Sequence, residues 1–261
     1  MPKCCRDSSM YNKGIRLDAN LAFLKSLVVY RLNPIRRIQS YRHYGHFIGP
    51  GDLCFDIGAH AGDRISTFLS LGASVIAIEP LPDFMKFLNQ LYGKNKRVVL
   101  VEAAVTSQNG NQSFFVSTKT PAMSTLNHWW TVSIARQDRF AKVVWNKKIE
   151  VKTLILDTLI RKYGSPKFCK IDVEGAEFDV LAGLTEPLAN LSFEYIPAHI
   201  DIALSCIERL SSLGTYRFNI SVGERKKFIF EKWENDYFIR DTLQRTAPND
   251  PSGDVYAMLQ L

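Results

Sequence analysis

The 261-residue sequence predicts an α/β fold in which helices cover both faces of a mainly parallel sheet. Short apolar runs of strand length alternate with amphipathic stretches of helix length from about residue 51 onward. A glycine-containing loop, residues 56–62, follows the first of these runs and opens a helix. The composition is ordinary for a globular protein, with 46% hydrophobic and 23% charged residues.

Local signals predict the individual elements. Asp18 could cap a helix over residues 18–32, and Pro34 suits the first turn of a second helix. Gly49-Pro50-Gly51 ends that helix and marks the entry to the main domain, so we expect a basic helical extension at 1–50 and one domain at 51–261. Strands are expected at residues 53–57, 74–79, 98–101, 168–172, 191–195, 215–222, 227–230 and 255–259, some of the last ones antiparallel. Helices are expected at about 63–71, 83–92, 176–183 and 200–210.

Residues 106–153 interrupt the alternation. Asn109-Gly110 predicts a turn between the strand-like runs 98–105 and 112–116. The segment 118–142 is polar, aromatic and irregular, and a loop of this length inside a compact domain is more often a lid or binding loop than a linker. Trp129 and Trp130 could cover an acceptor there, although a role as core or interface anchors is the stronger interpretation.

The net charge of +7 belongs to residues 1–50, which contain nine Lys or Arg and two Asp. This segment could attract nucleic acid, phospholipid or a charged substrate, but its basic residues are spread out, which favours an ordinary solvated helix face. No run of about 18 apolar residues predicts a membrane span, and no signal peptide is evident, so a cytoplasmic location is expected. The five cysteines lack the spacing of a disulfide framework or a zinc site.

The loop of residues 56–62 is the first candidate site. Gly58 and Gly62 let the backbone turn tightly and approach a ligand. Asp56 disfavours a pyrophosphate and could attract the ammonium of an amino-acid moiety, or organise water beside it. Glu79, at the end of the next strand, can accept hydrogen bonds from both hydroxyls of a ribose. The pair fits adenosine joined to an amino acid better than a dinucleotide, while a tight turn without a ligand is the alternative.

Carboxylates crowd the end of the strand expected at 168–172. Asp172 should lie across the crevice from Gly58, because open α/β sheets bind ligands at the carboxyl ends of their strands. Glu174 and Glu177 follow at the start of a helix, where acids are also favoured by the helix dipole. Glu194 ends another apolar strand and faces the same crevice, or is simply a satisfied polar group. Such oxygens would suit magnesium, but crowded acids alone do not predict a metal site.

Together these pieces resemble the FkbM family of S-adenosylmethionine-dependent methyltransferases. The resemblance runs in the family order over about residues 51–259 and leaves the first 50 residues uncovered. Its most specific piece is the KIDVEGAEFDVLAG block at 170–183. The other matching pieces are DIGAHAG at 56–62, AIEP at 77–80, VEAAV at 101–105, NG at 109–110, FEYIP at 193–197 and GDVYAM at 253–258.

The resemblance implies a seven-stranded Rossmann-like methyltransferase fold and methyl transfer to a hydroxyl oxygen. It implies S-adenosylmethionine as cofactor, with Glu79 on the ribose and Asp172 near the reacting methyl. His60 departs from the Asn that is frequent in the family, but both can hydrogen-bond through a side-chain nitrogen. The expected catalytic residues are Asp172, Glu174 and Glu194. The expected cofactor-binding residues are Asp56, Gly58, Ala59, His60, Gly62, Glu79, Pro80, Ala103 and Ala104.

Other functions stay open at this stage. The expected acceptor is a small molecule or carbohydrate, while a basic N-terminal segment could instead serve an RNA methyltransferase, for which no RNA-binding motif is evident. A non-catalytic cofactor-binding scaffold is disfavoured by the crowded carboxylates. A nicotinamide-dependent oxidoreductase is disfavoured by the GxxxG spacing of Gly58 and Gly62. The first helices could form a substrate lid or the interface of a homo-oligomer.

Overall fold

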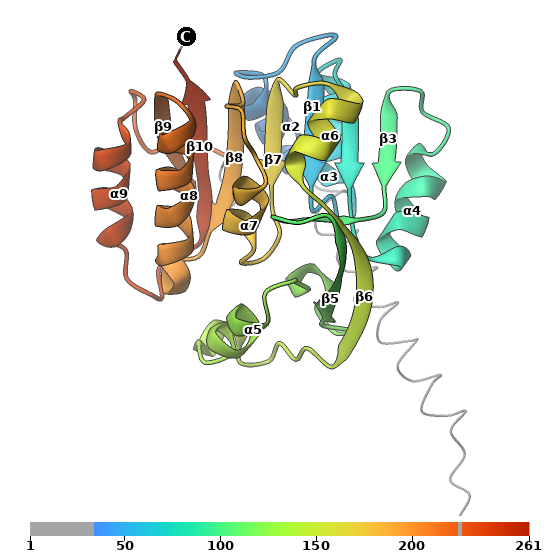
Figure 1. Ribbon diagram of the computed structural model, residues 1–261. Coiled ribbons are helices and arrows are strands. Elements are labelled where there is room, and N and C mark those ends of the chain that lie inside the picture. Colours follow the sequence, from blue (N-terminus) through green and yellow to red (C-terminus); the bar gives the residue numbers. More distant parts are fainter. Residues whose placement is uncertain (1–33, 224–225, 261) are drawn as a thin grey trace, which may run out of the picture.

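The computed structural model describes residues 34–223 and 226–260. Its centre is a seven-stranded sheet with the order β3-β2-β1-β7-β8-β10-β9 (Figure 1). Neighbouring strands are parallel except at β10, which is antiparallel to both β8 and β9. The predicted α/β, seven-stranded Rossmann-like fold is confirmed. The strands are β1 Leu53–Ile57, β2 Ser74–Ile78, β3 Val98–Val101, β7 Phe168–Ile171, β8 Asn190–Tyr195, β9 Tyr216–Val222 and β10 Gly253–Leu259.

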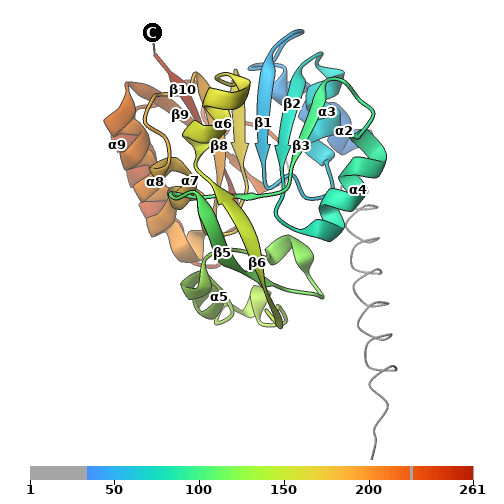
Figure 2. The ribbon, with the colours of Figure 1, turned by 45° about the vertical axis from the view of Figure 1, so that its right-hand side comes forward.

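Helices cover both faces of this sheet, which explains why its central strands are apolar throughout (Figures 1 and 2). In β1 the side chains alternate: Phe55 and Ile57 join one core cluster, and Cys54 joins the other. One face is covered by α2 Pro34–Tyr44, α3 Asp63–Ser70 and α4 Pro82–Tyr92. The opposite face is covered by α6 Leu156–Tyr163, α7 Glu177–Ala182, α8 Ile200–Leu213 and α9 Asp236–Gln244.

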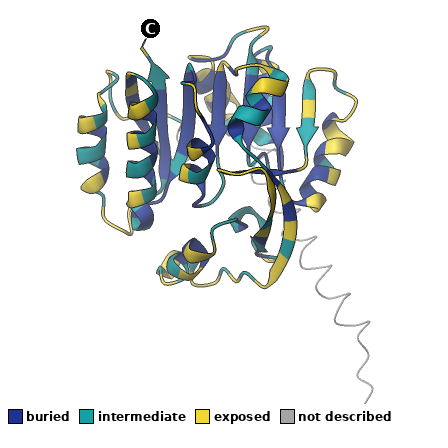
Figure 3. Ribbon diagram, viewed as in Figure 1, coloured by how far each residue is buried: buried dark blue, intermediate teal, exposed yellow. Residues whose placement is uncertain are grey.

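Helix α2 is packed into the core rather than set apart from it. Tyr44, the last residue of α2, and Phe47, just after it, are buried in the core: Tyr44 is 5.1 Å from Phe68 and Phe47 is 5.1 Å from Phe168 between ring centroids. Figure 3 shows the central strands of the large sheet as buried. The expected helix at 18–32 lies outside the described residues. Among the helices that the structure describes, none has the length and apolar character needed to cross a bilayer.

A smaller three-stranded sheet lies beyond the carboxyl ends of the parallel strands (Figure 1). It consists of β4 Ala104–Val105, β6 Lys147–Leu154 and β5 Gly110–Val116, in that order. The turn predicted at Asn109-Gly110 therefore does not join two paired strands: β4 pairs with β6 in parallel, and β5 pairs with β6 antiparallel. The Asn109 side chain instead accepts a hydrogen bond from the Ile155 N–H at 2.9 Å, which ties the turn to the start of α6.

The segment 118–142, expected to be irregular, contains the helix α5 His128–Ile134 and short 3-10 turns at 121–123 and 138–140. Asn127 caps α5 by accepting a hydrogen bond from the Trp130 N–H at 3.0 Å. Trp130 is fully buried, as expected for a core anchor, whereas Trp129 is 59% exposed.

The strand predicted at 227–230 does not form. Only one isolated bridge joins this segment to β9, between Phe228 and Ser221. The Asn219 side chain takes the place of a backbone ladder, because its amide donates to the Phe230 carbonyl and its oxygen accepts from the Phe230 N–H. Phe228 packs instead on His43 and Tyr256.

Candidate functional site

The loop after β1 is drawn tightly against the neighbouring strands. The N–H groups of Gly58 and Ala59 both donate to the Ile78 carbonyl, at 2.9 and 3.0 Å. Gly58 has φ +81°, and a Cβ built there would lie 1.8 Å from the backbone oxygen of Asp172. Only glycine therefore lets the loops after β1 and β7 meet, at the point where the strand order reverses.

Glu79 follows β2 and faces the same crevice. Its two carboxylate oxygens accept separate backbone hydrogen bonds, from the His60 N–H and the Leu81 N–H, both at 2.9 Å. Burial raises the pKa of Glu79 to about 7, against the two N–H groups, which favour the ionised form. The side chain is thus fixed in position, and each oxygen retains a lone pair for another donor.

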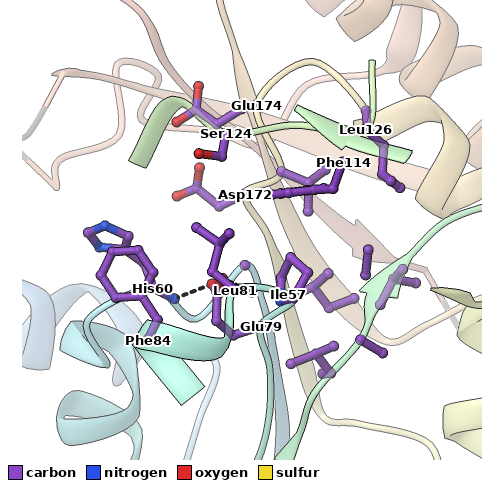
Figure 4. A pocket seen from close by; sticks show the side chains of 18 of the residues that line it. Ile57, His60, Glu79, Leu81, Phe84, Phe114, Ser124, Leu126, Asp172 and Glu174 are labelled. Atoms are coloured by element: carbon purple, nitrogen blue, oxygen red, sulfur yellow. Dashed lines mark hydrogen bonds between the residues drawn. The ribbon is translucent and has the colours of Figure 1, made fainter. Parts of the chain in front are cut away.

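These loops border a pocket (Figure 4). Figure 4 shows the side chains of His60, Phe84 and Glu79 on one side of the pocket and those of Asp172 and Glu174 on another. The lining includes Gly58, His60, Glu79, Pro80, Leu81, Phe84, Ala103, Ala104, Phe114, Ser124, Leu126, Asp172 and Glu174.

Six of the nine expected cofactor-binding residues line this pocket: Gly58, His60, Glu79, Pro80, Ala103 and Ala104. Asp56, Ala59 and Gly62 do not. Gly62, with φ +77°, precedes α3 and packs closely on α4, since a Cβ there would lie 2.8 Å from Leu88. Asp56 is fully enclosed, and neither carboxylate oxygen has a hydrogen-bond partner among the described residues. Burial raises the pKa of Asp56 to about 7.

Asp172, directly after β7, is held by basic side chains. Arg64 on α3 donates to its carboxylate at 2.7 Å, and the Lys170 ammonium lies 3.5 Å from the same oxygen. Lys170 is itself fully buried and pairs with Asp254 of β10 at 2.7 Å. Lys226 completes this chain of charges, 3.2 Å from Asp254. Although burial alone would raise it, Lys170 and Lys226 hold the pKa of Asp254 well below its ordinary value.

Asp172, Glu174 and Glu194 together form what we call the carboxylate cluster. Each offers an oxygen within 4.8 Å of the others, an arrangement that could hold a hard divalent cation. Burial, and then repulsion from neighbouring carboxylates, raises the pKa of Glu174 and Glu194 well above the ordinary glutamate value. Glu194 lines a second, smaller cavity beside the main pocket, with Trp130 and His199. The structure thus brings the three expected catalytic residues together.

The Glu177 side chain lies outside the carboxylate cluster and binds backbone N–H groups instead. It is buried, and its Oε1 accepts the N–H groups of Val173 and Gly175 at 3.2 and 3.3 Å. These two hydrogen bonds hold the backbone of the loop after β7, which is in line with a structural role for Glu177.

Several site residues were not expected from the sequence. Arg64 is the second residue of α3, and the chain offers no local signal that it reaches across to Asp172. Phe84 could have been found, because the first turn of a helix that follows Glu79 must border the same pocket. Ser124 and Leu126 belong to the segment expected to be irregular.

Comparisons by sequence match this chain to known methyltransferases. The methyltransferase FkbM domain matches residues 56–247. The chain is 26% identical over 189 residues to the hexuronic acid methyltransferase AglP of Haloferax volcanii, which covers 71% of this chain and 72% of that protein. It is 29% identical over 155 residues to the 2-O-methyltransferase NoeI of Sinorhizobium fredii, covering 56% of this chain and 63% of that protein.

Solved structures also match this chain at low identity. An O-methyltransferase from Bacillus cereus in complex with SAH matches with a TM-score of 0.47 and 11% identity, over 98% of this chain and 93% of that one. The precorrin-6y C5,15-methyltransferase of Geobacter metallireducens matches with a TM-score of 0.44 and 13% identity, over 86% and 87%. The domain match alone spans well over half of the sequence. The chain therefore belongs to the FkbM methyltransferase family and is an S-adenosylmethionine-dependent methyltransferase.

Proposed function

We propose that this protein transfers a methyl group from S-adenosylmethionine to a hydroxyl of a carbohydrate. The observation that carries the proposal is that the fixed carboxylate of Glu79 lines the same crevice as Asp172 and Glu174, two members of the carboxylate cluster. The acceptor class is supported by the relatives, one named a hexuronic acid methyltransferase and the other a 2-O-methyltransferase.

The pocket fits the nucleoside part of this cofactor. The free lone pairs of Glu79 match the two ribose hydroxyls, each of which can donate one hydrogen bond. Ala103 and Ala104 are small and buried, and Phe114 adds an aromatic wall, so a flat adenine can lie between them. Gly58 and Asp172 would then face the methionyl end. Because Asp56 is enclosed, we do not assign it a direct contact with the cofactor.

The carboxylate cluster supplies the acid–base chemistry. When bound, S-adenosylmethionine supplies an electrophilic methyl group on a sulfonium sulfur. Repulsion between Glu174 and Glu194 at short range raises the pKa of both and favours a state in which only one is ionised, and that carboxylate can take up a proton. A carboxylate oxygen of this pair would accept the proton of the acceptor hydroxyl, while the bound cofactor would supply the methyl group for that hydroxyl's oxygen.

Asp172 has a separate part in this scheme. Its hydrogen bond from Arg64 fixes the orientation of the carboxylate, so we assign Asp172 to positioning of the reacting groups. Placement of the acceptor oxygen in line with the methyl group supplies much of the rate enhancement in such a pocket.

Calorimetric titration with S-adenosylhomocysteine tests the cofactor site. We expect saturable binding that is about 100-fold weaker in Glu79→Ala, because two ribose hydrogen bonds to a charged acceptor are lost. Glu150→Ala removes an exposed acid of β6 outside the pocket and is the matched control. Equal affinity in all three proteins would overturn the assignment of Glu79.

Turnover with sugar acceptors tests the reaction. Release of S-adenosylhomocysteine is measured with glycosides of hexuronic acids and of neutral sugars, for the wild type and for Glu174→Gln and Glu194→Gln. We expect transfer to at least one sugar hydroxyl and its loss in both variants. Transfer to RNA but to no sugar, with salt-dependent RNA binding, would replace this acceptor class. Binding without transfer to any acceptor class would favour a scaffold.

A further inference from the structure

Two side chains of the segment that precedes α5 donate hydrogen bonds to backbone carbonyls of the loop after β7. The Asn127 side-chain amide donates to the Gly175 carbonyl at 2.7 Å. The Thr125 hydroxyl donates to the Val173 carbonyl at 3.5 Å. These contacts bridge 48 positions of sequence and connect the inserted segment to the strand end that carries Glu174.

Trp130 packs directly against the backbone of this loop. A Cβ built on Gly175 would lie 2.3 Å from Cδ1 and 2.6 Å from Nε1 of the indole, so ring and backbone are in close contact. Trp130 is fully buried in a cluster with Ile134 and Ile196, which fixes the ring in place. The glycine at 175 is therefore required by the tryptophan, as well as by its own φ of +86°.

Glu174 adopts a backbone conformation that a glutamate rarely takes. Its φ is +56°, and with Gly175 it forms two successive left-handed residues. Such a conformation persists only where surrounding contacts enforce it. The Glu177 carboxylate accepts hydrogen bonds from the Val173 and Gly175 N–H groups of this loop. The Asn127 amide donates to the Gly175 carbonyl.

We propose that Asn127 and Trp130 are positioning residues that hold Glu174 in this left-handed conformation and so keep its carboxylate beside Glu194. The inference rests on the proposed role of that pair in proton transfer. It gives the inserted segment a second task besides lining the pocket with Ser124 and Leu126. The expected cofactor-binding residues Gly58 and Glu79 follow other strands, β1 and β2, and do not contact Asn127 through these hydrogen bonds.

Asn127→Ser is the sharpest test. A serine still caps α5, because it can accept the Trp130 N–H, but it is too short to reach the Gly175 carbonyl. We expect kcat to fall by about 10- to 100-fold, the size of effect that a misplacement of about 1 Å produces. The affinity for S-adenosylhomocysteine should stay within about twofold of the wild type, since the variant leaves Glu79 untouched.

Two further variants complete the design. Trp130→Phe keeps an apolar ring but loses part of the contact with Gly175, and it should also lower kcat at unchanged cofactor affinity. Val132→Ala alters an exposed side chain of the same helix and should leave kcat unchanged. The pH profile of kcat/KM should shift to lower pH in Asn127→Ser, because a displaced Glu174 is repelled less by Glu194.

The variant Glu174→Gln distinguishes a failure of the proposed proton transfer from a failure of the positioning role alone. Normal turnover in Glu174→Gln would overturn the proposed proton transfer itself. Loss of turnover in Glu174→Gln with unchanged kcat and pH profile in Asn127→Ser and Trp130→Phe would overturn the positioning role alone. An equal loss of cofactor affinity and kcat would mean that the contact maintains the whole pocket, which also contradicts the proposal.

Discussion

Replacing Gly58 by alanine tests the close approach of the loops after β1 and β7. The built Cβ lies 1.8 Å from the Asp172 carbonyl oxygen, whereas real Cβ atoms keep at least 3.0 Å, so the loops must separate by about 1.2 Å. The added atom meets the backbone carbonyl of Asp172, which cannot move away as the end of a flexible side chain could. The strain therefore falls on the two strand ends that form the crevice.

The magnitude follows from two contributions. A left-handed conformation costs alanine about 1–2 kcal/mol, and forcing an extra carbon into a packed site costs about 1–3 kcal/mol more. We expect the free energy of unfolding of Gly58→Ala to fall by about 2–5 kcal/mol, measured by urea denaturation followed by circular dichroism. Binding of S-adenosylhomocysteine should fall with it, because Asp172 and the loop are displaced.

Gly51→Ala is the matched control. Gly51 also has a positive φ, +86°, but nothing lies within 4 Å of a Cβ built there. Its loss of stability should be limited to the conformational cost of about 1–2 kcal/mol, with cofactor binding retained. If the two variants lose equal stability, the contact with Asp172 contributes nothing and the reasoning about this glycine is wrong.

Other predictions concern charge. Because burial raises the pKa of Glu79 to about 7, affinity for S-adenosylhomocysteine should fall as the pH drops below 7 and the carboxylate gains a proton; calorimetry on Glu79→Gln should show a flat profile. Lys170→Met should destabilise the protein by about 3–5 kcal/mol in urea denaturation, since Asp254 loses a buried partner. Asp172→Asn should abolish turnover in an S-adenosylhomocysteine release assay with the fold intact by circular dichroism. Dialysis against a chelator should leave turnover unchanged. A loss of turnover that added magnesium restores would instead assign the carboxylate cluster to a bound cation.

Much of the large sheet could be predicted because its central strands are buried on both faces. Strand β1, which is buried from its second residue on, begins and ends at the predicted residues. The edge strand β3 does so too, although it is only partly buried, because its sequence is apolar throughout. Strand β6 was missed because it has an alternating, largely polar sequence and its partners lie far away in the chain. Helix α5 is seven residues long, too short to show a helical period.

The site residues that follow the ends of parallel strands could be predicted from the sequence. Asp172 meets Gly58 because parallel strands end at a common edge, and Glu79 follows from the same rule. Long side chains that cross between elements follow no such rule, so Arg64 was missed. The predicted strand at 227–230 failed because a side chain, that of Asn219, competes with the backbone for its partners.

The placement of β10 governs the order in which the chain can fold. β10 follows β9 along the chain, yet it lies between β8 and β9 in the sheet. As the polypeptide leaves the ribosome, β9 has no edge to join until β10 has emerged, and β8 presents an open, apolar edge until then. Translation that pauses before residue 253 would leave this edge exposed, and chaperone binding to nascent chains should peak at that length.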